Sequence, residues 1–152
     1  MVHIPADMLA RFLSQAMLLK LALAKYFGLN AIQFMTLLLV GETAVGVSVK
    51  ALRERLAIPG SSLTFTLDSL EKKHLIKRRR SSQDRRQWLL SLTEKGERLY
   101  AEMLEKESEA VGPSLVGFTE ADTEAFLRIS GEISRSSAAS AIVLSRGGDI
   151  AD

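Results

Sequence analysis

Apolar residues at helical spacing dominate the chain, and one charged segment in its second half interrupts this pattern. Apolar positions that recur after three and four residues are typical of helices that bury one face. In residues 6–27 and 31–40 the apolar positions run nearly all round, which indicates helices covered on more than one side. The pattern predicts helices over residues 6–27, 31–40, 49–57, 61–73, from 94 onward and from 119 to about 135.

Short polar residues mark the expected helix starts, because their side chains accept hydrogen bonds from the first free amides. We expect such caps at Asn30 (with Gln33), Ser48, Thr93 and Thr119 (with Asp122). The pair Gly112-Pro113 is predicted to kink the helix that starts at residue 94 rather than to end it. Residues 136–152 are rich in Ser, Ala and Gly, which predicts a flexible tail.

The segment 58–96 is the part around which the other elements are placed. Its helix buries Leu63, Leu67 and Leu70, and two strand-like runs follow, Leu75-Ile76 and Trp88–Leu92. Residues 77–87 between them contain no apolar side chain, so they are expected to form a charged hairpin tip. In the second run Trp88, Leu90 and Leu92 share the face expected to pack on the helices, and Val47 is expected to add a very short strand.

Two short helices followed by a basic hairpin are the layout of a winged helix-turn-helix. The predicted fold is therefore mainly α with a small β-hairpin wing, a winged helix-turn-helix flanked by N- and C-terminal dimerisation helices. We assign residues 1–28 and 94–135 to helical dimerisation and residues 29–93 to a DNA-binding domain. The apolar first helix is either a well-buried core helix or one whose far face is covered by a second subunit, and we favour the second reading.

Charge is concentrated in the hairpin. Residues 71–86 hold eight Lys or Arg and two acidic residues, whereas residues 94–152 hold six basic and twelve acidic residues. A cationic patch confined to one hairpin is what nucleic-acid binding requires, although a run of charges is also common in solvated loops.

Other classes of function lack the residues they would need. The chain has no cysteine and two distant histidines, His3 and His74, which predicts no metal site, and it has no glycine-rich phosphate loop or nucleophile–base pair, so we expect neither a cofactor nor an enzyme. Its longest uncharged run, residues 26–41, is too short for a bilayer span, and no signal peptide is apparent, so we expect a cytoplasmic protein without a membrane partner.

Two stretches resemble the MarR family of transcription regulators. SSLTFTLDSLEKKHLIKR is similar to the family's recognition helix and first wing strand, and DRRQWLLSLTEKG is similar to its D-x-R wing, second strand and following helix start. The resemblance implies a homodimeric repressor that binds pseudo-palindromic double-stranded DNA and is released by a small apolar or aromatic effector. The alternative is a winged-helix module that binds another protein without specific DNA readout.

The sequence departs from the family pattern at three positions. Phe65 stands where the family often has Arg or Lys, Pro59 where Asp or Asn is common, and His74 where Gly is usual. Phe65 either contacts a thymine methyl or turns into the core, and His74 is expected to end the helix in a left-handed conformation.

The candidate site residues form two groups. Those on the recognition helix are Ser61, Ser62, Thr64, Phe65 and Ser69. Those on the wing are Arg79, Arg80, Asp84, Arg85 and Arg86. The resemblance implies that Arg86 enters the minor groove while Asp84 orients an arginine; the other wing cations are phosphate contacts or solvated charges.

Overall fold

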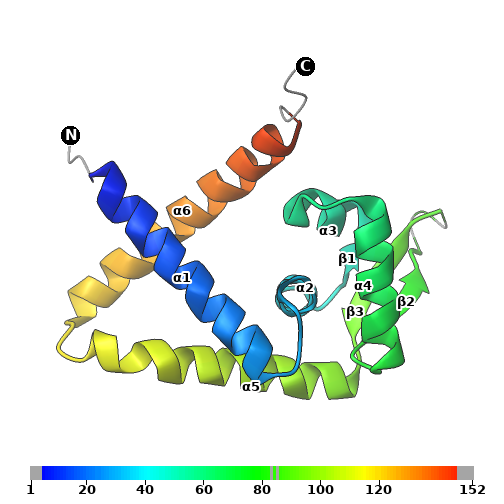
Figure 1. The fold of residues 1–152 in the computed structure, drawn as a ribbon, viewed down its shortest axis with the longest axis horizontal. Coiled ribbons are helices and arrows are strands. Elements are labelled where there is room, and N and C mark those ends of the chain that lie inside the picture. Colours follow the sequence, from blue (N-terminus) through cyan, green and yellow to red (C-terminus); the bar gives the residue numbers. More distant parts are fainter. Residues whose placement is uncertain (1–4, 83, 85, 147–152) are drawn as a thin grey trace.

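The computed structural model describes residues 5–82, 84 and 86–146 of the 152-residue chain. The elements in chain order are α1 (Ala6–Tyr26), α2 (Ala31–Gly41), β1 (Val47–Ser48), α3 (Val49–Leu56), α4 (Gly60–Lys72), β2 (Ile76–Arg80), β3 (Trp88–Leu92), α5 (Glu94–Val111), the 3-10 helix η1 (Gly112–Leu115) and α6 (Glu120–Arg146). Figure 1 shows a lobe built from α2, α3, α4 and the strands, from which α5 leads away toward α1 and α6. The predicted mainly α class with a small hairpin wing is confirmed.

The three strands form one antiparallel sheet in the order β1-β3-β2. Val47 pairs with Leu90, so the predicted short strand does join the hairpin. The pairing of β2 with β3 continues from Ile76 to Arg80, which shows that the predicted end of this strand at Ile76 is wrong. Pairing with β3 satisfies the backbone groups on one side of this charged edge strand, and such pairing needs no apolar side chain.

The core is built around α2, whose Phe34 and Leu37 are fully buried. Helices α1, α3, α4 and α5 and strand β3 all contact α2. Each surrounding element contributes side chains to this core, including Leu52, Leu63, Leu67, Leu70, Leu90, Leu92 and Met103. The prediction for Trp88 is wrong, because this side chain is 40% exposed and lies outside the core.

The predicted caps are confirmed. The Asn30 side chain accepts from the Gln33 amide at 2.9 Å, and the Gln33 side chain accepts from the Asn30 amide at 3.1 Å. The hydroxyls that cap the other three helices accept backbone amides in the same way, at Ser48, Thr93 and Thr119. These caps are local, since donor and acceptor are three residues apart, and a linear sequence shows them directly.

The C-terminal helices differ from the prediction. Helix α5 ends at Val111 and a separate 3-10 helix follows, so Gly112-Pro113 ends the helix rather than kinking it. Proline has no amide to continue the hydrogen-bond ladder, and Gly117 then turns the chain with a φ of +96°. Helix α6 continues to Arg146, beyond its predicted end near Arg135. Residues 136–146 of the predicted tail are thus helical, and 147–152 lie outside the described residues.

Large apolar side chains remain exposed along α1 and α6. In α1 Leu23 and Ala24 are buried, but most of its large apolar side chains are not, as at Phe12, which is 60% exposed. The reading of α1 as a well-buried core helix of a single chain is therefore wrong. The large exposed apolar side chains of the described parts of the two helices are Met8, Leu9, Phe12, Leu13, Met17, Leu18, Leu21 and Tyr26 on α1 and Phe126, Leu127, Ile129 and Ile133 on α6.

None of the helices in the described part of the chain is by itself both long and apolar enough to cross a bilayer. Residues Asp7–Tyr26 and Ala31–Gly41 reach that length and composition only as a pair, and the pair is bent by 97°.

Candidate nucleic-acid interface

Helix α4 presents one exposed face, opposite the leucines that anchor it. Leu63, Leu67 and Leu70 are buried, as predicted, and Thr66 is buried with them. The exposed side chains recur at three and four residues and form one stripe: Ser61, Thr64, Phe65, Asp68 and Lys72. A helix with this arrangement can lie in a groove while its other side stays in the core.

Phe65 is 74% exposed, whereas the leucines of the same helix are buried. It is not part of the hydrophobic core cluster. The alternative that Phe65 turns into the core is therefore wrong, and the ring belongs to the outward face.

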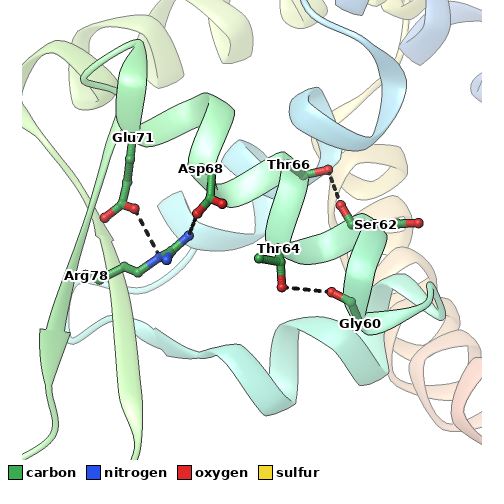
Figure 2. A network of polar contacts seen from close by, with 7 residues as sticks. All are labelled: Gly60, Ser62, Thr64, Thr66, Asp68, Glu71 and Arg78. Atoms are coloured by element: carbon green, nitrogen blue, oxygen red, sulfur yellow. Dashed lines mark hydrogen bonds and ion pairs between the residues drawn. The ribbon is translucent and has the colours of Figure 1, made fainter.

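Three hydroxyl groups of α4 are already engaged within the protein, and Figure 2 draws the first two. Thr64 Oγ1 donates to the Gly60 carbonyl at 3.0 Å, and Thr66 Oγ1 donates to the Ser62 carbonyl at 2.9 Å. Ser69 accepts a hydrogen bond from Gln33 Nε2 at 2.9 Å, which holds its side chain against α2. Of the predicted recognition-helix residues, Ser61, Thr64 and Phe65 are exposed, whereas Ser62 and Ser69 are half-buried.

Arg78 joins the wing to the recognition helix. Its Nη2 lies 2.5 Å from Asp68 Oδ1, and its Nε lies 3.2 Å from Glu71 Oε2 (Figure 2). The Nε contact is a charge contact only, because its geometry does not satisfy a hydrogen bond. The sequence predicts Arg78 as a phosphate contact or a solvated charge, so its contacts with the two carboxylates of α4 were not predicted. The available signal was the pair of carboxylates three residues apart on one side of α4.

The next two wing arginines also have partners within the chain. Arg79 Nη2 donates to the Val45 carbonyl at 2.6 Å, which ties β2 to the loop before β1. The Arg80 guanidinium lies 4.0 Å from the centre of the Trp88 ring, a distance typical of a cation–π contact. Both side chains remain exposed, so each cation can also meet a phosphate.

Asp84 shapes the turn at the wing tip. Its Oδ1 accepts from the Arg86 amide at 2.9 Å, and its Oδ2 accepts from Gln87 Nε2 at 3.1 Å. The carboxylate thus fixes the backbone that carries Arg86, whose side chain is exposed. Arg85 lies outside the described residues. Within the described residues, no group of acidic or histidine side chains could hold a metal ion.

The end of α4 is fastened to the start of α5. His74 adopts the predicted left-handed conformation with a φ of 58°. Its carbonyl accepts from Thr93 Oγ1 at 2.5 Å, and the Leu75 carbonyl accepts from the Thr93 amide at 3.1 Å. A Cβ built on Gly96 would lie 2.0 Å from the Leu75 carbonyl oxygen, so only glycine allows this close approach. The orientation of the recognition helix is therefore fixed relative to α5.

The helix with an outward face and the three-stranded sheet beside it define a winged helix-turn-helix protein. Residues 27–87 match the sequence model of the MarR family. The chain is similar over its whole length to a MarR family transcriptional regulator from Listeria monocytogenes complexed with a 26mer DNA, at 23% identity, 100% coverage of both chains and a TM-score of 0.72.

Two structures of MepR from S. aureus are also similar to this chain. A MepR mutant from a multidrug resistant clinical isolate has 21% identity, 89% and 99% coverage of the two chains and a TM-score of 0.75. A MepR–DNA complex has 22% identity, 88% and 99% coverage and a TM-score of 0.60. The segment 27–87 thus matches the MarR family of transcription regulators in sequence, and the whole chain shares its fold with these solved structures.

Proposed function

We propose that this protein is a transcriptional repressor that binds pseudo-palindromic double-stranded DNA as a homodimer. The observation that carries the proposal is the exposed stripe of α4 beside a cationic wing, with Arg78 holding the two together. Two of the structures to which the chain is similar are DNA complexes, which supports the same reading. In the proposed complex α4 enters the major groove and Arg86 the adjacent minor groove, while Arg79 and Arg80 meet phosphates.

The proposed dimer rests on the exposed apolar surface of α1 and α6. A groove of about 620 Å³ between α1, α5 and α6 is lined largely by apolar side chains, among them Phe12, Leu104 and Phe126. Contiguous apolar surface of this kind is unusual on a monomer and suits a second copy of the chain. We therefore propose residues 1–28 and 94–135 as the dimerisation region and residues 29–93 as the DNA-binding domain. The extra length of α6 adds to the first of these.

A second groove offers a place for a small-molecule effector. It has a volume of about 420 Å³, lies between α1 and α5, and is lined by Leu19, Leu23, Tyr26 and the ion pair of Lys106 with Glu109. Its mixed apolar and charged lining would accept a small apolar or aromatic molecule. Such a molecule would act as an effector if it bound the DNA-free dimer more tightly than the DNA complex.

The test is a duplex titration at two salt concentrations together with light scattering. We expect a mass of twice 16.7 kDa and an affinity that falls steeply with salt, because each neutralised phosphate releases counterions. A selected duplex should bind more tightly than a random one of equal length. No duplex binding at low salt would leave the alternative, a protein-binding module, which the exposed Phe65 favours; a monomer at micromolar concentration would refute the dimer.

A further inference from the structure

We infer that Phe65 reads the 5-methyl group of a pyrimidine in the major groove. The preferred DNA would then carry a thymine opposite this ring in each half-site, and 5-methylcytosine could take its place. This inference rests on the proposed function and names the chemical group that α4 recognises.

The first observation is the exposure of the ring itself. Phe65 is 74% exposed on the same stripe as Ser61, Thr64 and Asp68, so it stands at the centre of the surface proposed to face the bases. Covering an exposed aromatic ring with an apolar partner is favourable, because it removes apolar surface from water. In the major groove the only apolar group on a base edge is the C5-methyl of thymine, or the same methyl on a modified cytosine.

The second observation is what the stripe lacks. Guanine is read by paired donors from Arg or Lys, and the part of the stripe from Ser61 to Asp68 has neither. Thr64 already donates its hydroxyl hydrogen to the Gly60 carbonyl, which leaves its oxygen as an acceptor. From Ser61 to Asp68 the stripe therefore offers one aromatic ring, two hydroxyl groups and one carboxylate, none of which is the paired donor that reads guanine, whereas the ring suits a methylated pyrimidine.

The third observation is the position of Asp68, one helical turn beyond Phe65. Arg78 Nη2 holds its carboxylate at 2.5 Å, yet the side chain of Asp68 is still 51% exposed. A carboxylate is repelled by phosphates and accepts from the exocyclic amines of bases, so this part of the stripe is suited to base edges rather than to the DNA backbone. Phe65 is thereby placed over bases as well.

The experiment starts from a duplex selected from a random pool by the full-length protein. Each thymine is replaced in turn by deoxyuridine, which removes only the methyl group. We expect one thymine in each half-site whose replacement weakens binding about four-fold, the effect of one buried methyl group. In the Phe65→Ala protein the same replacement should have no effect. A cytosine placed at that position should bind more tightly when it carries a 5-methyl group.

Val45→Ala is the matched control, because Val45 is apolar and 73% exposed but lies in the loop before β1. It should keep the full penalty for deoxyuridine. Phe65→Ala should melt at the wild-type temperature, since the ring is outside the core. The inference is overturned if no thymine methyl matters to the wild type, or if Phe65→Ala retains the penalty. Failure of every duplex to bind would instead overturn the proposed function.

Discussion

Replacing Gly96 with alanine tests the joint between the recognition helix and α5. The added Cβ would lie 2.0 Å from the Leu75 carbonyl oxygen and 3.0 Å from its carbonyl carbon. Since comfortable contacts between such atoms are about 3.5 Å, the start of α5 must move by more than about 1 Å. That movement strains the bonds from Thr93 to the His74 and Leu75 carbonyls, each of which contributes about 1 kcal/mol.

With the cost of overpacking included, we expect Gly96→Ala to lower the free energy of unfolding by about 2–4 kcal/mol. Urea titrations followed by circular dichroism measure this quantity, at one protomer concentration throughout because a dimer's stability depends on it. Gly131→Ala in α6 is the control. Its new Cβ meets only Arg135 Nη1 at 3.7 Å, so this change should be neutral or stabilising by about 0.5–1 kcal/mol. A loss below about 0.5 kcal/mol for Gly96→Ala would refute the close approach at the joint.

Three further predictions concern the core, the wing and the last helix. Leu67→Ala should cost about 2–5 kcal/mol in the same urea titration, because Leu67 is 2% exposed; an unchanged midpoint would mean that α4 packs through another face. Arg86→Ala should weaken binding to a selected duplex by about 1–3 kcal/mol. Arg79→Ala should weaken binding to all duplexes alike and lower the slope of log affinity against log salt by about one. Equal losses of affinity for the two variants, measured by fluorescence anisotropy, would mean that the wing contributes only non-specific electrostatic attraction. The hydroxyl and the amide of Thr119 donate hydrogen bonds to the Asp122 carboxylate and lower its pKa. The stability contributed by Asp122 is therefore present above the unfolded pKa and is lost as the pH falls through the lower folded pKa. Asp122→Ala should remove this acid-dependent loss from an acid titration followed by circular dichroism, and identical titrations of the two proteins would contradict the cap.

The elements that sequence predicts well are those specified by nearby residues. The caps at Asn30 and Thr93 and the left-handed His74 each depend on a few neighbours in the chain. The buried leucines of α4 follow from helical periodicity, because residues spaced three and four apart lie on the same face of a helix. For these reasons the mainly α class and the small wing could be predicted from the amino-acid sequence alone.

The features that sequence missed depend on residues brought together by folding. Arg80 belongs to a strand because it pairs with Trp88, and nothing in four consecutive basic residues predicts a strand. Arg78 meets Asp68 ten positions earlier, a contact set by how β2 crosses α4. The exposure of the apolar side chains of α1 could not be predicted either, because an apolar helix face has the same sequence pattern whether it packs against its own chain or against a second one.

Trp88 makes the wing visible by spectroscopy. It is the only tryptophan of the chain, and its ring is 40% exposed with the Arg80 guanidinium 4.0 Å from its centre. Indole emission depends on nearby charge and water, so the intrinsic fluorescence of the unmodified protein reports on the end of the wing strands next to the hairpin tip. A ligand that draws Arg80 away from the ring will change that emission, while one that binds far along α1 or α6 and leaves the wing in place will not.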